Sequence, residues 1–418
     1  MTVIVFLGVL FSLMLIGMPI AFAMLCAAVV MMWTQGMFDV TTLAEYFITG
    51  ANNFALMAIP FFILTGEIMN AGGISTRIVT FASSLVGHVK GGLGYVAILS
   101  GVIFAGLSGS AVADTAALGA ILIPMMVAQG YARDRATGLV ASVGILGTVL
   151  PPSIPLILYG VVGGVSITGL FMAGIVPGLI MALAMTLTWW AVSRKAGMAR
   201  LEKAGWRTRG IAFRRAFWAL LLPLIIIVGL RGGVFTPTEA GVVAAVYAFI
   251  IASLHRELRA GQLLDVLVGT AKTTAIVMLI ASAAIVTAYA ITVAQVPLQI
   301  AQGLSSLTDN PTLMLLIMLI LLLFGCVMDM TPAVLIFAPV LIPVVQQLGI
   351  DPIYFGILMI INLSIGLITP PVGTVLYVGC SISRISLMEI TRGIWPMLIV
   401  YLGIYCCSFC SRSSCWYR

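Results

Sequence analysis

Apolar residues run along this chain in long, unbroken stretches separated by short polar or basic segments. Many stretches are about 20 residues long, the length of a helix that spans the hydrocarbon core of a bilayer. A transmembrane β-barrel would instead show segments of about 10 residues in which apolar and polar side chains alternate. Because only helices and closed barrels satisfy the backbone in lipid, the pattern predicts an all-α, polytopic membrane protein.

The apolar stretches predict the same arrangement in each half of the chain, five spanning helices and one hairpin. In the first half we place the helices near 3–16, 18–33, 54–70, 134–165 and 169–193, and the hairpin near 93–128. In the second half they fall near 217–230, 236–254, 264–292, 353–380 and 390–408, with the hairpin near 312–348. The first stretch has no basic start and no small-residue cleavage site, so we expect it to be retained.

An internal repeat underlies this arrangement, because five motifs recur at a single offset of 219 residues. The pairs are Pro151-Pro152 with Pro370-Pro371, Gly147 with Gly366, Leu122–Pro124 with Leu341–Pro343, Gly130 with Gly349, and Gly174 of "GIVP" with Gly393 of "GIWP". Five agreements in one register are not expected by chance. The sequence therefore predicts two copies of one unit, residues 1–193 and 216–410, followed by an atypical tail rich in Cys and Ser at 411–418.

A basic segment, residues 194–215, joins the two copies. It holds eight Lys and Arg residues against one acid, Glu202. Basic loops mark the cytoplasmic side of a membrane protein, and the predicted layout puts 17 of the 20 Lys and Arg residues on the side of this linker. Because five spans are an odd number, the second copy enters the membrane in the opposite sense. Inverted repeats of this kind are typical of secondary transporters, whose site lies near the bilayer midplane.

Each copy contains a hairpin whose tip is rich in small residues. "GLSGSAVADTAALG" (106–119) and "GCVMDMTPA" (325–333) place glycines where a helix would be interrupted, followed by Asp114 and Asp329. Each acid has two interpretations, an N-cap for the returning limb or a part of an ion site. Such re-entrant loops are tolerated at membrane depth only where they are buried in protein or line a cavity.

A second break in each copy is a double proline inside an apolar helix, in "GTVLPPSIPLILYG" and "GLITPPVGTVLY". Proline lacks an amide donor and clashes with the carbonyl four residues earlier, so the carbonyls before Pro151 and Pro370 lose their partners. A cation such as Na⁺ can satisfy these carbonyls, and the N-termini of the half-helices attract an anionic group. We therefore expect each tip to pair with the break of its own copy, and a substrate to lie between the two tips.

Other functional classes fit the sequence less well. "GTAKTT" (269–274) has Ala271 where a phosphate-binding loop needs Gly before Lys. The two histidines, His88 and His255, lie beside basic loops and leave no hydrolytic or His-metal site at membrane depth. The net charge of +7 is scattered over short loops, so we expect no nucleic-acid partner. An intramembrane protease that pairs Asp114 with Asp329 remains a distant alternative to a protein without enzymatic activity.

Six motifs resemble signatures of the large membrane subunit of the TRAP (tripartite ATP-independent periplasmic) transporters. They are "IPFFILTGEIMNAGG", "SGSAVADTAALG", "PPSIP", "TPTEAG", "APVLIP" and "GLITPPVGTVLY", in the order of that family, over about residues 5–400. The resemblance implies a Na⁺-driven importer of an organic acid, such as a C4-dicarboxylate, sialic acid or another sugar acid, in a bacterial inner membrane. It also implies an elevator mechanism, with scaffold helices in 1–90 and 216–308 and a transport domain in 91–193 and 309–410.

The resemblance further implies two protein partners, a small four-helix membrane subunit and a periplasmic substrate-binding protein. The sodium sites carried over from the family fall on Ser108, Gly109, Ser110, Asp114, Gly147, Thr148, Pro151, Gly325, Asp329, Thr331, Gly366, Thr369 and Gly373. The implied substrate contacts are Ser110, Ser153, Thr331, Pro371 and Thr374. A self-sufficient sodium-coupled carboxylate transporter or exchanger of the same broken-helix type is the alternative. The chain departs from the family after about residue 405, which leaves the length of the last helix open.

Overall fold

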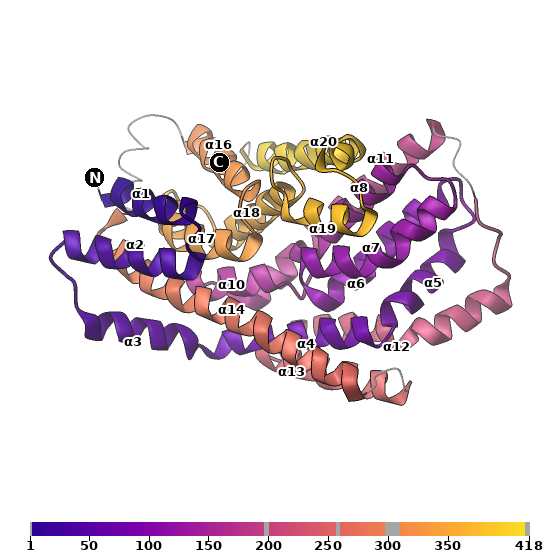
Figure 1. The fold of residues 1–418 in the computed structure, drawn as a ribbon, viewed down its shortest axis with the longest axis horizontal. Helices are drawn as coiled ribbons and strands as arrows, with labels where there is room; N and C mark the ends of the chain where they lie inside the picture. The colour runs from indigo at the N-terminus through magenta and orange to yellow at the C-terminus, as the bar shows by residue number, and fades with distance from the viewer. Residues whose placement is uncertain (1, 196–199, 256–259, 297–309, 414–418) are drawn as a thin grey trace.

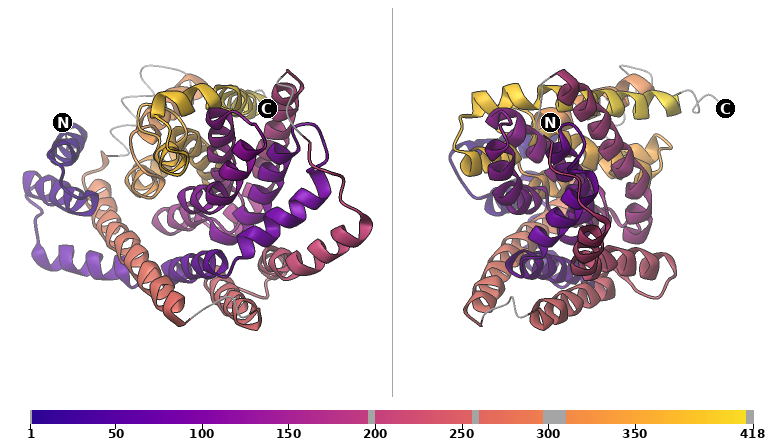
Figure 2. Two further views of the ribbon diagram at one scale, coloured as in Figure 1. Left: turned by 45° about the vertical axis from the view of Figure 1, so that its right-hand side comes forward. Right: turned by 90° about the vertical axis from the view of Figure 1, so that its right-hand side faces the viewer.

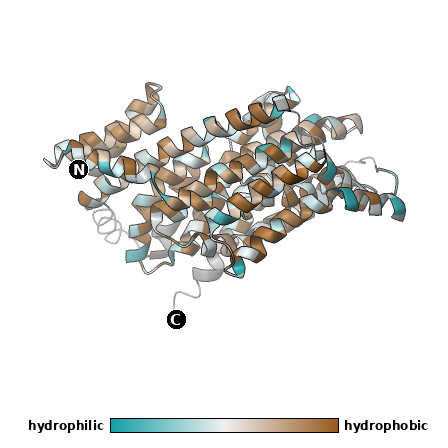
Figure 3. Ribbon diagram, turned by 90° about the horizontal axis from the view of Figure 1, so that it is seen from below, coloured by the Kyte–Doolittle hydropathy of each residue, from teal (hydrophilic) through white to brown (hydrophobic). Residues whose placement is uncertain are grey.

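The computed structural model describes residues 2–195, 200–255, 260–296 and 310–413, and every regular element in these ranges is a helix. Figure 1 shows the helices lying roughly alongside one another in a single bundle. Hydrophobic residues dominate the lengths of the helices in Figure 3, and hydrophilic residues gather toward their ends. Large apolar side chains such as Leu183, Leu224 and Val246 are more than half exposed. These outward apolar faces suit lipid contact, and the all-helical membrane class is confirmed.

The first half contains α1 (Thr2–Leu15), α2 (Ile20–Thr34), α3 (Val40–Ala51), the 3₁₀ turn η1 (Phe54–Met57), α4 (Ala58–Ala71), α5 (Ile74–Val86), α6 (Gly92–Ser108), α7 (Ala111–Ala128), α8 (Arg133–Gly144), α9 (Leu146–Val149), α10 (Ile154–Gly163) and α11 (Ile167–Lys195). The second half contains α12 (Trp206–Arg231), α13 (Pro237–Leu254), α14 (Ala260–Val293), α16 (Asn310–Gly325), α17 (Met330–Gln347), α18 (Pro352–Leu367), α19 (Thr374–Ser383) and α20 (Leu387–Ser413). The last helix thus continues past residue 405, and residues 414–418 of the tail lie outside the described ranges.

Nine helices within the described ranges are long and apolar enough to cross a membrane. These nine helices are not the same as the ten spanning helices that the sequence predicts. The returning hairpin limbs α7 and α17 qualify, whereas α1 and α2 are shorter than a full span. The second double-proline segment is divided into the shorter helices α18 and α19. Length alone therefore does not separate spanning helices from re-entrant limbs.

Two helices, α3 and α5, were not predicted from the apolar stretches. Both are short and amphipathic, so neither produces a continuous apolar run. Asp39 starts α3 by accepting hydrogen bonds from the amides of Thr41 and Thr42, at 3.2 and 2.8 Å. In α5 the buried positions, including Ile74, Ile78 and Ala82, recur at helical spacing on one face. The sequence feature that could have predicted both helices is the helical spacing of their apolar residues, and not their mean hydropathy.

The helix boundaries recur at the offset found in the sequence. Helices α7 and α17 begin and end 219 residues apart, and α8 and α18 begin 219 residues apart. Both double prolines interrupt a helix, between α9 and α10 and between α18 and α19. In each pair the peptide bond between the prolines is cis. The hairpin and the broken helix are therefore one structural unit that occurs twice.

The helices pack in two groups. The outer group contains α1–α5 and α12–α14, in which α13 packs on α4, α14 on α2 and α3, and α12 on α5. The inner group contains α6–α11 and α16–α20, in which helices of the two halves interlock through the pairs α10 with α17 and α7 with α19. Helices α1–α4 and α12–α14 follow the left and lower edges of Figure 1, and α12–α14 stay at the bottom in both turned views of Figure 2.

The crossing of α8 and α20 allows a test of the packing in the inner group. A Cβ at Gly393 would lie 2.2 Å from the carbonyl oxygen of Asp134, so the two backbones touch there. On the same helix, a Cβ at Gly403 would meet nothing within 4 Å. We expect Gly393→Ala to destabilise the protein by about 1–3 kcal/mol, because a backbone must move to admit the methyl group.

The measurement is the thermal unfolding midpoint of the purified protein in detergent. The matched control Gly403→Ala should leave the midpoint unchanged or slightly higher, because Ala is the better helix former. Equal midpoints for the two variants would contradict the close crossing of α8 and α20.

Candidate substrate and cation site at the helix breaks

The first hairpin tip is docked on the double-proline break of its own half. Gly109 ends α6 with φ +66°, a left-handed conformation that favours glycine. Its carbonyl accepts a hydrogen bond from the amide of Ile154, at 3.3 Å. A Cβ at Gly109 would lie 2.6 Å from the carbonyl oxygen of Pro152. The tip and the break thus meet backbone to backbone, as the sequence predicted.

The second hairpin tip makes an equivalent contact in the other half. The carbonyl of Cys326 accepts hydrogen bonds from the amides of Val372 and Gly373, at 3.2 and 3.1 Å. A Cβ at Gly366 would lie 2.6 Å from the Cα of Gly325, so only glycine allows this approach. The second tip therefore supplies an acceptor to the amides that follow the second double proline.

Asp114 lies buried behind the first tip, with 1% of its surface exposed. Ser108 donates a hydrogen bond to its Oδ1. Its Oδ2 is buried and has no hydrogen-bond partner among the described residues. A Cβ at Gly147 would lie 2.1 Å from this Oδ2, which brings the carboxylate against the first break. A buried carboxylate oxygen without a donor is costly, and oxygen atoms from Ser108, Asp114 and the break are the ligand type that a hard cation takes.

Asp329 occupies the N-cap position of α17 but makes no side-chain capping bond. Its Oδ1 instead accepts a hydrogen bond from the hydroxyl of Thr374, at 3.2 Å, across the second break. Asp114 lies within the first turn of α7, where Ser110 is the N-cap. Neither acid is therefore an N-cap in the usual sense. Their separate partners also disfavour a protease, in which two carboxylates share one site.

Hydroxyl groups line both breaks. The Thr369 hydroxyl donates to the carbonyl of Ile365, at 2.6 Å. The Thr148 hydroxyl lies 2.6 Å from the carbonyl of Ile145 and 2.6 Å from the hydroxyl of Ser364. That contact joins the first break to the helix that precedes the second. The Thr369 proton is donated to the last turn of α18, so its oxygen lone pair and its carbonyl are the groups that can face a ligand.

A cavity of about 370 Å³ lies between the two tips. The described lining comprises Gly109, Ser110, Ala111, Val112, Thr148, Ile154, Pro155, Asp329, Met330, Thr331, Pro332 and Leu367 from the inner group, and Ile20, Ile63, Thr273, Ile276, Val277 and Ile280 from the outer group. The lining thus includes Ser110 and Thr331, two of the five predicted substrate contacts. It contains no Lys, Arg or His.

The other three predicted substrate contacts lie outside this lining. Ser153 is fully buried, and its hydroxyl donates to the carbonyl of Thr148. Thr374 is occupied by its hydrogen bond to Asp329. Pro371 is exposed at the second break. In this conformation Ser153, Pro371 and Thr374 lie at the two breaks, but they do not line the cavity.

Three helices begin at the cavity. The first residues of α7, α10 and α17 all contribute to its lining. The N-cap serines of α7 and α10 accept bonds from the amides of Ala113 and Leu156, at 3.5 and 3.4 Å. A helix N-terminus carries a partial positive charge, about half an elementary charge. Three such ends can attract an anionic group without a basic side chain.

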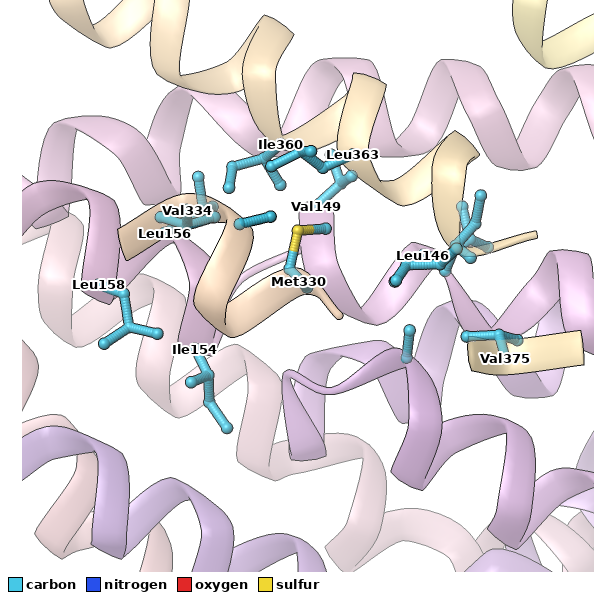
Figure 4. Close-up of a cluster of buried hydrophobic side chains, with 14 of the residues drawn as sticks. Leu146, Val149, Ile154, Leu156, Leu158, Met330, Val334, Ile360, Leu363 and Val375 are labelled. Atoms are coloured by element: carbon cyan, nitrogen blue, oxygen red, sulfur yellow. The ribbon is translucent and has the colours of Figure 1, made fainter. Parts of the chain in front are cut away.

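The apolar surroundings of the cavity come from both halves of the chain. Figure 4 shows Val149 and Leu156 of the first half beside Met330, Val334 and Ile360 of the second. All five side chains are buried. This cluster fixes the relative positions of α10 and α17, and so of two of the helix ends at the cavity.

The sequence did not predict the wall that the outer group supplies. Thr273 and three apolar residues of α14 line the cavity, together with Ile63 of α4. Thr273 belongs to "GTAKTT", which the sequence singled out only as a failed phosphate loop. No sequence motif identifies a residue that lines a site from a neighbouring group of helices. Such residues are found only from the tertiary packing.

Comparison with known proteins bears on this architecture. A model of the family described as "Tripartite ATP-independent periplasmic transporter, DctM component" matches residues 7–407. A putative TRAP transporter large permease protein of Haemophilus influenzae is 59% identical over 90% of this chain and 94% of its own. The 2,3-diketo-L-gulonate TRAP transporter large permease protein YiaN of Escherichia coli is 50% identical over 97% of this chain and 96% of its own.

A more distant relative is the sialic acid TRAP transporter large permease protein SiaM of Vibrio cholerae, 39% identical over 94% of this chain and 92% of its own. Among solved structures, the YdaH transporter of Alcanivorax borkumensis aligns with a TM-score of 0.66 over 90% of this chain and 88% of its own, at 17% identity. At that identity the likeness concerns the fold alone. The family model and the full-length relatives establish that the chain belongs to the large permease, or DctM, family of the TRAP transporters.

Proposed function

We propose that this protein imports an organic acid across the bacterial inner membrane, driven by a sodium gradient. The observation that supports this most directly is the cavity between the two hairpin tips, where three helices begin, Asp329 lines the wall and Asp114 lies buried behind the first tip. Helix N-termini attract the carboxylate of a substrate, while the acids and freed carbonyls attract a cation. The combination suits co-transport of an anion with a positive ion.

The proposed sodium positions follow the two contacts between tip and break. Asp114 supports the first, because its Oδ2 is buried, lacks a hydrogen-bond partner among the described residues and faces Gly147. Ser108, Gly109, Ser110, Thr148 and Pro151 complete this first group. Asp329, with Thr374 on its carboxylate, supports the second, together with Gly325, Thr331, Gly366, Thr369 and Gly373. In this arrangement Na⁺ is a co-substrate that crosses with the acid.

The proposed movement is that of an elevator with inverted repeats. The two groups of helices support it, because the hairpins and broken helices all belong to the inner group and the cavity wall is shared with the outer group. The outer wall is mostly apolar, with Ile63, Ile276, Val277 and Ile280, and such a surface lets an inner group slide without breaking hydrogen bonds. The basic linker at 194–215 is placed on the cytoplasmic side in this proposal.

The proposed substrate class and partners extend those of the relatives. The names of the relatives include 2,3-diketo-L-gulonate and sialic acid, both sugar acids. The family description names a tripartite system, of which this chain is one component. We therefore propose a sugar acid or a dicarboxylate as substrate, a periplasmic binding protein that delivers it, and a separate small four-helix membrane subunit.

Uptake into proteoliposomes tests this proposal. With the small subunit and the binding protein present, an inward Na⁺ gradient should drive accumulation of the labelled acid, and a K⁺ gradient should not. Accumulation without the binding protein would instead favour a self-sufficient sodium-coupled carboxylate transporter of the same broken-helix type. Peptide cleavage without uptake would contradict both transport proposals.

Asp114→Asn tests the first cation position. The substitution removes the charge and preserves the shape, so we expect Na⁺ stimulation of uptake to fall at least tenfold, a factor that corresponds to about 1.4 kcal/mol of lost binding. The matched control is Asp265→Asn, an exposed acid on α14 that should leave Na⁺ stimulation unchanged. Wild-type Na⁺ dependence in the Asp114 variant would remove this carboxylate from the cation site.

Gly109→Ala tests the contact between the first tip and its break. The added Cβ would meet the carbonyl of Pro152 at 2.6 Å, so the tip must move and transport should be lost. Gly164→Ala is the control, because Gly164 also ends a helix, at φ +63°, but its Cβ would meet nothing within 4 Å. Both variants carry the left-handed cost of about 1–2 kcal/mol, visible as a similar fall in the unfolding midpoint. Similar uptake by both would show that the tip does not need its close approach to the break.

A further inference from the structure

A second cavity, of about 720 Å³, lies away from the helix breaks. Its described lining comes from the end of α4, the start of α5, the basic part of α12 and the end of α13. None of these residues lines the cavity between the tips. The proposed transport cycle gives this second cavity no role, so its chemistry calls for a separate explanation.

The described lining is basic and contains no acid. Arg77 comes from α5, Arg215 from α12 and His255 from the C-cap of α13. The His255 Nδ1 lies 2.8 Å from the carbonyl of Ile251, and since a carbonyl only accepts, this nitrogen donates. Three cationic or polar side chains from three separate helices thus converge on one space. Arginine presents a planar fork of donors that matches the oxygen atoms of a phosphate group.

The start of α5 adds to this chemistry. Gly73 is its N-cap, with φ +64°, and has no side chain to cap the first turn. Gly73 and Thr76 both line the cavity, so the positive end of the α5 dipole lies at its wall. Helix N-termini and arginine side chains are together a common setting for phosphate oxygens.

Apolar and aromatic surface adjoins the basic cavity. Trp218 follows Arg215 by one turn on α12 and is 42% exposed, and the hydroxyl of Tyr247 donates to its carbonyl. Leu254, next to His255, is 72% exposed. Trp218 lies where the basic start of α12 gives way to its apolar part, and an exposed Trp at such a boundary marks the level of lipid headgroups. A free phosphate would use only the basic cavity, whereas a phospholipid would use both surfaces.

We propose that this cavity binds the phosphodiester headgroup of an anionic phospholipid, such as phosphatidylglycerol, in the leaflet that faces the basic linker. The phosphate contacts Arg77 and Arg215, and the acyl chains follow the exposed faces of α12 and α13. Such a lipid would tie the start of α5 to α12 and α13 within the outer group.

Native mass spectrometry of the full chain in detergent, titrated with phosphatidylglycerol or phosphatidylcholine, tests this site. We expect one tightly retained phosphatidylglycerol and no equivalent phosphatidylcholine. A basic residue near a membrane surface contributes roughly a fivefold change in lipid affinity, so Arg77→Gln with Arg215→Gln should weaken binding by about 25-fold. The unfolding midpoint without added lipid shows whether the variant is folded. If the double variant fails to fold, Arg215→Gln alone, at an exposed position of α12, should still weaken phosphatidylglycerol binding about fivefold.

The matched control is Arg207→Gln with Arg214→Gln, which removes the same charge from exposed positions of α12 outside the cavity lining. This control should bind phosphatidylglycerol within twofold of the unmodified protein. Equal losses in the two double variants, or equal binding of phosphatidylcholine, would overturn the site. Inorganic phosphate that displaces the lipid at comparable concentration would overturn the assignment to a lipid in favour of a soluble phosphate.

Discussion

A helix that is broken inside a membrane must find partners for its backbone, and this constraint organises the inner group of helices. Each double proline separates two helices of the inner group. In the second half the amides after the break bond to the carbonyl of Cys326, and in the first half the amide of Ile154 bonds to the carbonyl of Gly109. Lipid offers no such partners. A re-entrant hairpin does, so the hairpin and the broken helix depend on one another.

The close approach that makes these bonds also creates the cavity. Glycine lets each hairpin tip approach its break backbone to backbone. As a result, the N-termini of α7, α10 and α17 all lie at the cavity between the tips. A site built from helix ends has a particular chemical character. It attracts a carboxylate through the backbone, which mutation changes little, and leaves the surrounding side chains to distinguish one acid from another. This separation suits a family whose members are named for different organic acids.

The sequence predicted the features that follow from local chemistry. Repeated prolines and glycines at a fixed offset located the tips, the breaks and their pairing within each half. Helices α3 and α5 were not predicted because their apolar residues lie on one face of the helix and form no continuous run in the sequence. Thr273 in the wall and the partners of Asp114 depend on how separate helices pack, which no local motif encodes. The sequence did not predict the basic cavity for the same reason, because Arg77, Arg215 and His255 belong to three separate helices.

The two halves have the same backbone plan but place their acids differently. Asp114 is sealed behind the first tip, bonded to Ser108 and 1% exposed. Asp329 is half-buried and lines the cavity beside Thr331, with its carboxylate held by Thr374. In the proposed cycle a cation at Asp114 would be insulated from the substrate, whereas one at Asp329 would lie next to it and lose solvent when the acid arrives. Because desolvation strengthens the attraction between opposite charges, the proposed cycle assigns the coupling between ion and substrate mainly to the second half, and a cation at Asp114 would stabilise the first tip itself.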